Sequence, residues 1–319
     1  MSLSALRMAD TRDIERAEWL KLRRRGIGGS DAAAIAGLNP WRSPVQVYME
    51  KAGAIPNDDE PSEAAYWGTV LEDVVAQEFT RRTQLKTQRI NAILQHPEHP
   101  FMLANVDRRI VATDEGPGIL ECKTGSAFAR EDWEDGKVPA HYMIQVQHYL
   151  AVTGYQYGYI AVLLGGRDFR YARIERDEEL ISYLINIEQE FWGRVERRDP
   201  PKFDGSDASS ELLTQMYPEA QPNKAIDLPS EADLLIAEYE LAKAEETAAT
   251  ERKEAAANRL KAMIGEAELG YCRERIVSWK QITSNRLDAK ALKADHPNLH
   301  DQYLKQSSYR RFTITSVKE

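Results

Sequence analysis

The sequence predicts an α/β (α+β) fold in which a mixed central sheet is flanked by helices, followed by a long helical arm and a small basic αβ module. Glycine-bounded segments at 103–124 and 157–174 have the alternating and apolar patterns of strands. Segments with helical periodicity before and between them predict the flanking helices. We expect a core in residues 1–210, a linker in 211–228, a helical arm in 229–265 and the basic module in 266–319.

The 319 residues are enough to bury the core of one principal domain and to carry additions. We find no signal peptide and no long apolar span, and therefore expect a cytoplasmic protein with no membrane partner. The two cysteines, Cys122 and Cys272, are too few for a disulfide framework or a four-cysteine iron–sulfur cluster. We expect Cys122 to be a small hydrophobe on the packed side of its strand, together with Leu120.

The net charge of -9 does not exclude a nucleic-acid partner, because the charges are segregated along the chain. Residues 226–270 hold five Lys and Arg against eleven Asp and Glu, whereas residues 271–319 hold ten against five. A site rich in carboxylates takes its affinity for phosphate from bound metal and nearby arginines, and not from the charge of the whole protein.

The first segment with a chemical signal is 19–37, which combines basic side chains, a glycine turn and an alanine-rich run. Ser30 or Asp31 would be the N-cap of a helix that ends near Gly37. Free backbone amides at the start of such a helix can bind an anion. An ordinary capped helix after a glycine loop explains the same residues, so this segment alone leaves both interpretations open.

Residues 66–79 predict a helix whose apolar face is formed by Leu71, Val74, Val75 and Phe79. Glu72 lies at the edge of this face. Asp73 and Glu78 are expected to face solvent.

The next signal is a predicted hairpin, in which strands at 103–111 and 118–124 are joined by a Gly-Pro-Gly turn. Side chains alternate between the two faces of a strand, so Glu121 and Lys123 point the same way. Asp107 lies on the other strand. Two carboxylates and an ammonium group are therefore expected to share one site.

These side chains suit the metal-assisted hydrolysis of a phosphodiester. Hard carboxylate oxygens are ligands for Mg²⁺ or Mn²⁺, and a lysine beside them can orient or deprotonate an attacking water. Charged residues at a two-residue spacing on an exposed strand are, however, more often simply solvated. The interpretation therefore needs support from the rest of the chain.

Residues 141–154 predict a helix that carries the pattern Gln-x-Gln-x-Tyr-Leu. Gln145 is its candidate site residue, because an amide can hydrogen-bond a water or a phosphate without competing for a metal. Gln147 and His148 are expected either at the surface or as satisfied polar groups of the core.

The pattern of Asp107, Glu121 and Lys123 resembles the core of the PD-(D/E)XK nuclease superfamily. All four motifs, taken in order, resemble the YqaJ viral recombinase family, which includes phage lambda exonuclease. The resemblance covers about the first 200 residues, and it implies a restriction-endonuclease-like core in residues 1–210.

The resemblance also implies roles for individual residues. The terminal 5′-phosphate of DNA would be held by Arg23 and Ser30. The catalytic residues would be Glu72, Asp107, Glu121, Lys123 and Gln145. The metal ligands would be Asp107, Glu121, the backbone carbonyl of Cys122, and Glu72. Lys123 and Gln145 would position the attacking water.

By the same resemblance, the protein would be an Mg²⁺-dependent (or Mn²⁺-dependent) exonuclease that degrades one strand of duplex DNA from its 5′ end. The remaining 3′ single strand would pass to a single-strand annealing protein in a phage-type recombination reaction. Double-stranded DNA ends would be the substrate, in the cytoplasm of a bacterial or phage-infected cell. Relatives form trimeric rings around DNA, so a homo-oligomer is expected.

Three alternatives stay open at this point. The nearest is a metal-dependent endonuclease with the same core, which would not need a terminal phosphate. The second is a noncatalytic DNA-end-binding recombination scaffold. The third is a metal hydrolase that acts on small molecules.

The C-terminal part has a different character. A capping pattern at 229–233 precedes residues 234–264, which are rich in Ala, Glu and Lys and predict a long exposed helix. Such an arm could contact a partner or a neighbouring subunit, and a solvated spacer explains the same residues. Sparse heptad positions make a coiled coil the weaker interpretation.

Residues 271–283 predict a strand, residues 287–293 a short helix and residues 309–317 a closing strand. Basic side chains are spread over this module, and they could hold duplex phosphates, bind an acidic surface or simply be solvated. They are Arg273, Arg275, Lys280, Arg286, Lys290, Lys293, Lys305, Arg310 and Arg311.

Overall fold

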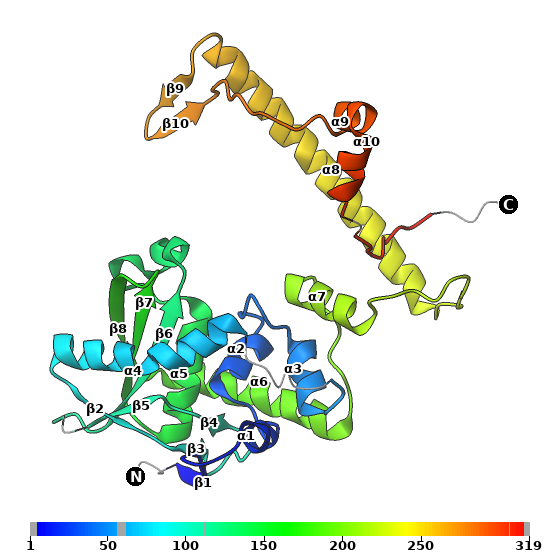
Figure 1. The fold of residues 1–319 in the computed structure, drawn as a ribbon. Coiled ribbons are helices and arrows are strands. Elements are labelled where there is room, and N and C mark those ends of the chain that lie inside the picture. The colour runs from blue at the N-terminus through cyan, green and yellow to red at the C-terminus, as the bar shows by residue number, and fades with distance from the viewer. Residues whose placement is uncertain (1–4, 56–61, 112, 306, 316–319) are drawn as a thin grey trace. The chain divides into compact units, whose positions relative to one another are not determined.

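The structure, a computed structural model, describes residues 5–55, 62–111, 113–305 and 307–315. Two compact units divide the chain, Met1–Met216 and Tyr217–Glu319. Figure 1 labels the helices and strands of both units.

The first unit is built on a five-stranded sheet with the strand order β2-β5-β6-β7-β8. Its strands are β2 (Lys86–Arg89), β5 (Arg108–Val111), β6 (Gly118–Gly125), β7 (Tyr157–Leu164) and β8 (Asp168–Glu175). β6 and β7 are parallel, and the other neighbouring pairs are antiparallel. The predicted mixed central sheet is confirmed, and its middle strand, β6, carries Glu121 and Lys123.

Helix α5 (Ala140–Thr153) lies on one face of this sheet (Figure 1). It connects β6 to β7, because two parallel strands need a crossover between them. The 3-10 segment η1 (Ala127–Gly136) precedes it in the same connection. A core cluster that includes Ile119, Val146 and Ile160 joins α5 to the sheet.

Helix α4 (Glu63–Thr83) covers the opposite face, against which Val75 and Phe79 pack. Val74 was also predicted on the buried side, but it is 50% exposed, so that prediction is wrong. The reason is the helical period of 3.6 residues. The buried face of α4 is centred near Val75 and Phe79. Val74 therefore points away from the sheet, and Glu72 points towards it.

Strand β6 is therefore covered on both faces. Leu120 and Cys122 belong to the side packed by α4, as predicted, and Cys122 is half-buried there. Glu121 points to the other side and is only 4% exposed. A carboxylate at this position is inside the protein, which is not where a merely solvated surface charge would lie.

The predicted strand at 103–111 is instead two short strands. β4 (Leu103–Ala104) belongs to a separate three-stranded sheet with β1 (Leu6–Asp10) and β3 (Ala92–Gln95), while β5 belongs to the central sheet. The chain leaves the ladder between them because Asp107 uses its side chain, and not its backbone, to bond strand β6. The predicted hairpin itself is present as the antiparallel pair of β5 and β6.

Further helices complete the first unit. They are α1 (Arg16–Arg23), α2 (Gly29–Ile35), α3 (Pro44–Lys51), α6 (Glu178–Arg197) and α7 (Asp207–Met216). The alanines of α2 are buried in a second core cluster, which also contains residues of α3, α5 and α6. Their small size lets α2 lie close to its neighbours.

The start of α2 differs from the prediction. Its N-cap is Gly28, and neither Ser30 nor Asp31 takes that position. Asp31 is the third residue of the helix, from which its carboxylate accepts a hydrogen bond of 3.0 Å from the backbone N–H of Gly28.

The second unit contains α8 (Glu231–Ile264), which confirms the predicted long helix and has no buried residue. The predicted strand at 271–283 is a hairpin, β9 (Leu269–Cys272) and β10 (Arg275–Ser278). It turns at Arg273, whose φ is 50°. The chain continues into two short helices, α9 (Ala289–Asp295) and α10 (Pro297–Gln302).

The predicted closing strand at 309–317 is not formed over residues 309–315, and the last two positions lie outside the described residues. Within the described part of the chain, no helix combines the length and the apolar character that crossing a bilayer requires.

Candidate active site

Six of the predicted site residues line one cavity of about 230 Å³. They are Arg23, Ser30, Asp107, Glu121, Lys123 and Gln145. They come from α1, α2, the turn before β5, strand β6 and helix α5, so segments far apart in the sequence converge here. Glu72 is not among the residues that line this cavity.

The two carboxylates of the cavity are held differently. Asp107 accepts a hydrogen bond of 2.8 Å from the backbone N–H of Cys122 through Oδ2. Glu121 accepts through Oε1 from Lys123 Nζ at 2.8 Å and from Gln145 Nε2 at 2.6 Å. Its other oxygen, Oε2, is buried and has no partner among the described residues.

Lys123 lies between a carboxylate and an aromatic ring. Its ammonium group pairs with Glu121, two residues earlier on the same face of β6. The same Nζ is 5.1 Å from the centroid of the Tyr142 ring, on α5. These contacts fix the direction of a long side chain, so that the charge is held over the cavity.

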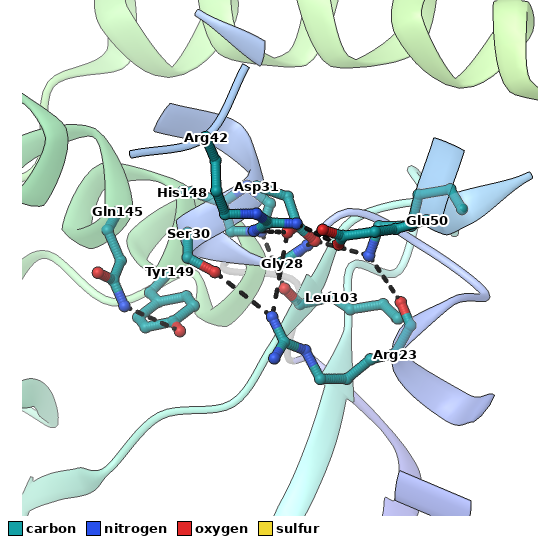
Figure 2. A network of polar contacts seen from close by, with 11 residues as sticks. Arg23, Gly28, Ser30, Asp31, Arg42, Glu50, Leu103, Gln145, His148 and Tyr149 are labelled. Atoms are coloured by element: carbon teal, nitrogen blue, oxygen red, sulfur yellow. Dashed lines mark hydrogen bonds and ion pairs between the residues drawn. The ribbon is translucent and has the colours of Figure 1, made fainter. Parts of the chain in front are cut away.

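Gln145 and Tyr149 are one turn apart on α5, where Gln145 Nε2 also donates to the Tyr149 hydroxyl at 3.2 Å (Figure 2). Gly29 lies against both of them. A Cβ atom on Gly29 would be 2.7 Å from a ring carbon of Tyr149 and 2.8 Å from Cγ of Gln145. Only glycine allows α2 and α5 to approach this closely.

The ionisable groups carry the electrostatic signature of a cation site. Burial, with the charges of Glu121 and Glu72, raises the pKa of Asp107 well above its usual range. Burial also raises the pKa of Glu121, against the opposing effect of Lys123. Burial alone would lower the pKa of Lys123, but Glu121 and Asp107 outweigh it and raise that pKa. The single ammonium group therefore leaves negative charge uncompensated.

A divalent cation fits this donor set. Asp107 and Glu121 offer hard oxygens, and the buried Oε2 of Glu121 needs a partner. The side-chain oxygen of Asn105, which lines the same cavity, is also buried without a described partner. No group of three or more His, Cys, Asp or Glu side chains with metal-binding spacing occurs among the described residues. Backbone oxygens, waters and phosphate oxygens would have to complete the shell, as Mg²⁺ commonly requires.

Glu72 is held outside the cavity by arginines. Its Oε1 pairs with Arg108, and it lies 3.5 Å from Arg89 Nη2. Arg108 also pairs with Asp73 and donates to the backbone carbonyl of Asp107 at 2.6 Å. Asp73, which was expected to face solvent, is 61% exposed but takes part in this network. Metal ligation by Glu72, and by the backbone carbonyl of Cys122, stays a prediction.

Arg23 and Ser30 lie together, with 3.4 Å between Arg23 Nη2 and Ser30 Oγ (Figure 2). The guanidinium group is also stacked 4.8 Å from the ring centroid of Trp19. The same Nη2 also lies 4.0 Å from Oδ1 of Asp31, and Arg23 lines the cavity, where its guanidinium group can meet an anion.

Behind Ser30 lies a buried charge cluster that sequence reasoning missed (Figure 2). Asp31 is fully buried and pairs with Arg42 at 2.7 Å and with Lys51 at 2.6 Å. Burial alone would raise the pKa of Asp31, but Lys51, Arg42 and Arg23 outweigh it and lower that pKa well below its usual range. Lys51 also donates to the backbone carbonyl of Arg23 at 2.9 Å, so the cluster ties α1, α2 and α3 together.

The cluster changes one expectation about the helix start. The backbone N–H of Gly28 bonds Asp31, and so is not free for an external anion. An anion in the cavity would instead meet the side chains of Arg23 and Ser30.

The sequence profile of the family described as the YqaJ-like viral recombinase domain matches residues 18–156. The uncharacterized protein YqaJ of Bacillus subtilis (strain 168) is 43% identical over 313 residues, covering 97% of each chain. The chain belongs to the YqaJ family. All eight predicted site residues, counting Cys122 for its backbone carbonyl, fall within the stretch that the YqaJ profile matches.

Two solved structures resemble this chain more weakly. LHK-Exo, an alkaline exonuclease from Laribacter hongkongensis, was solved in complex with dAMP, with 20% identity and a TM-score of 0.49. That match covers 63% of this chain and 97% of the other. A second crystal structure of LHK-Exo gives 19% identity and a TM-score of 0.47.

Several cavity residues were not singled out from the sequence. Trp19 and Tyr149 each stand one helical turn from a predicted site residue, Arg23 and Gln145 respectively, and that spacing is the signal that could have found them. Asn105 stands two residues before Asp107 in the same turn.

Proposed function

We propose that this protein is a divalent-metal-dependent deoxyribonuclease that removes nucleotides from the 5′ end of duplex DNA and leaves a 3′ single strand. Membership of a viral recombinase family supports a nuclease that acts in recombination. LHK-Exo is described as an alkaline exonuclease, and exonuclease activity is proposed for this chain.

The observation that carries the proposal is the meeting of Asp107, Glu121 and Lys123 in one cavity. A buried carboxylate with an unpartnered oxygen, that of Glu121, beside the half-buried carboxylate of Asp107 is costly unless a cation joins the two. A cation, two carboxylates and a lysine are the groups that phosphodiester hydrolysis needs.

In this proposal, Asp107 and Glu121 hold Mg²⁺ or Mn²⁺, with the carbonyl of Cys122 and the carboxylate of Glu72 as further candidates. The ion would polarise the scissile phosphate and lower the pKa of a bound water. Lys123 donates a hydrogen bond to the attacking water or to a phosphate oxygen. Gln145 is bonded to Glu121 and can turn its remaining amide oxygen towards the same water.

The preference for the 5′ end of the strand would come from Arg23 and Ser30. Both line the same cavity as the carboxylates, so a phosphate bound to them would belong to the nucleotide next to the scissile bond. A terminal 5′-phosphate carries more charge than an internal one and would bind the guanidinium group more strongly. The cavity of about 230 Å³ is small, which favours one terminal nucleotide over a continuous strand.

The protein would also act with partners. The 3′ strand would be passed to a single-strand annealing protein. The protein would act as a homo-oligomer, with a trimeric ring as the form that the family resemblance implies. The second unit, with its basic side chains, would contact DNA or a partner.

The test uses four DNA substrates with purified protein and Mg²⁺: linear duplex with 5′-phosphate, linear duplex with 5′-hydroxyl, closed circular duplex and single strands. We expect fastest loss of nucleotides from 5′-phosphorylated linear ends and no loss from circles. Equal cutting of circles and linear DNA would identify an endonuclease. Binding of ends without any cutting, over a range of Mg²⁺ and Mn²⁺ concentrations, would identify a noncatalytic scaffold. Faster turnover of small phosphoesters than of DNA would identify a metal hydrolase of another class.

A further inference from the structure

A second hollow, larger than the cavity, opens beside it in the first unit. It has a volume of about 660 Å³, in the range of pockets that enclose a ligand. Its wall is unusually aromatic, and we call it the aromatic groove. The aromatic side chains that line it are Trp41, Trp67, Trp133, His141 and Tyr142.

The aromatic groove begins where the catalytic cavity ends. Lys123 lines the cavity, and its ammonium group contacts the ring of Tyr142, which lines the groove. The next residue of β6, Thr124, lines the groove as well. Gln145 of the cavity is one turn along α5 from His141. A chain that leaves the cavity past Lys123 therefore enters the groove.

Four of the five aromatic side chains of the groove, Trp67 being the exception, form a connected series. Trp41 and His141 meet edge to face with centroids 5.1 Å apart, His141 and Tyr142 are 4.0 Å apart, and Tyr142 and Trp133 are 5.7 Å apart. Trp41 is nevertheless 64% exposed and Trp67 51% exposed. Indole rings left open to solvent at the rim of a pocket are typical of a binding surface.

The groove also offers polar groups. Nε2 of His141 is buried and has no hydrogen-bond partner among the described residues. Thr124, Ser126 and Asp132 stand in the same wall. A wholly apolar ligand would leave the imidazole nitrogen unsatisfied, whereas a nucleobase brings both a flat π-face and hydrogen-bonding edges.

We infer that the aromatic groove binds unpaired nucleobases of the strand being cut, on the 3′ side of the scissile phosphate. The inference rests on the proposed function, in which the terminal nucleotide lies between Arg23 and the carboxylates. The following nucleotides must then leave past Lys123. Paired bases cannot offer their faces to the rings, so the first bases beyond the cut are separated from the complementary strand. Stacking of this kind tolerates any sequence, which suits a nuclease that degrades DNA from its end.

The experiment measures equilibrium binding with Ca²⁺ in place of Mg²⁺, so that DNA stays uncut. The probe is a 5′-phosphorylated duplex whose first four nucleotides are mismatched, and a second probe lacks the bases of nucleotides two to four of that strand. We expect wild-type protein to bind the abasic probe about tenfold or more weakly. Trp41→Ala should weaken binding of the intact probe about tenfold and shrink the abasic penalty below about twofold.

Two further variants separate stacking from folding. Trp41→Phe keeps a ring and should restore most of the binding. Tyr183→Ala removes an aromatic ring of similar exposure, 59%, from α6, outside the groove, and should leave both probes unaffected. Because Trp41 is largely exposed, its replacement should not unfold the protein.

The inference is overturned if the abasic penalty persists unchanged in both Trp41→Ala and Trp67→Ala. It is also overturned if only abasic sites in the complementary strand weaken binding. A base-dependent affinity that requires Trp41, in a protein that cuts no DNA in Mg²⁺, would support the groove and reject the proposed nuclease. Cutting of DNA with no effect of base removal would reject the groove alone.

Discussion

The carboxylate of Asp107 accepts a hydrogen bond of 2.8 Å from the backbone N–H of Cys122. In the antiparallel pairing of β5 with β6, Arg108 lies opposite Leu120. At the neighbouring position, the side chain of Asp107 takes the place of a backbone hydrogen-bond partner. This bond lies immediately before the first residue of β5 and keeps Asp107 at the wall of the cavity that Glu121 also lines. One contact therefore both interrupts a strand and positions the first carboxylate of the site.

Replacement of Lys123 tests the chemistry of the site. Because its ammonium group bonds Glu121 over the cavity, Lys123→Ala should lower the rate of DNA hydrolysis by about 10²- to 10⁴-fold. The affinity for DNA ends should change far less, because the lysine contributes more to the reaction than to DNA binding. Single-turnover rates and end binding are measured in parallel, with Lys137→Ala, an exposed lysine, as the control. Unimpaired hydrolysis by Lys123→Ala would refute the role.

Replacement of Arg23 tests the preference for 5′-phosphorylated ends. Arg23→Ala should reduce the preference for 5′-phosphate over 5′-hydroxyl ends by about tenfold or more, because a charge-assisted hydrogen bond contributes about 1.5–3 kcal/mol. Rates on the two kinds of end are compared for the variant and for Arg81→Ala, whose side chain is 69% exposed on α4. An unchanged preference in Arg23→Ala would contradict the assignment of Arg23 to a pocket that binds the terminal phosphate.

Replacement of Asp31 tests the buried cluster behind Ser30. Asp31→Asn would leave Lys51, whose side chain is 4% exposed, without its carboxylate partner. The free energy of unfolding should fall by about 3–5 kcal/mol, the cost of breaking a buried ion pair from one side. Urea denaturation measures it, with Asp13→Asn at an exposed position as the control. A loss below about 1 kcal/mol would show that the cluster is not what holds α1, α2 and α3 together.

A second buried pair, His148 and Glu188, shares one proton between Nδ1 of the imidazole and the carboxylate. Nε2 of His148 lies 2.9 Å from the carbonyl of Leu103, which can only accept, so that nitrogen carries a hydrogen. Nδ1 lies 2.9 Å from Oε1 of Glu188, and that contact also needs a proton. Burial alone would lower the pKa of His148, but Glu188 outweighs it and raises that pKa. Burial raises the pKa of Glu188.

The pair gives stability a defined pH dependence. Above about pH 6.5, an unfolded histidine has lost its proton, while the native pair of His148 and Glu188 still holds one. The native state then binds more protons, so the free energy of unfolding should fall as pH rises, by up to about 1.4 kcal/mol per pH unit, until the native pair is deprotonated. Urea midpoints of wild type and Glu188→Gln are compared from about pH 6 to 9. The same slope in both proteins would contradict the shared proton.

Features whose partners are close in sequence could be predicted. Glu121 and Lys123 share a face because strand side chains alternate, and their contact is found. The helix of Gln145 follows from its own pattern, and the family motifs supplied Arg23 and Ser30. The structure brings all five of these, with Asp107 added, into one cavity.

Features that depend on packing between distant segments could not be predicted. Arg42 reaches Asp31 from 11 residues away and Arg108 reaches Glu72 from 36 residues away. No local spacing encodes either contact, because each exists only once a helix has docked. The burial of Glu121 has the same origin: the sequence placed it on the face of its strand opposite Leu120 and Cys122, and the docking of α5, whose Gln145 bonds it, leaves it only 4% exposed.

The central claim is that Asp107 and Glu121 together bind a divalent cation. Anomalous diffraction from crystals soaked in Mn²⁺ measures this directly. We expect a manganese peak within about 2.5 Å of a carboxylate oxygen of each residue, including Oε2 of Glu121, and no such peak in crystals of Glu121→Ala. Wild-type crystals with no peak between the two carboxylates, at a Mn²⁺ concentration that sustains DNA cleavage in solution, would contradict it.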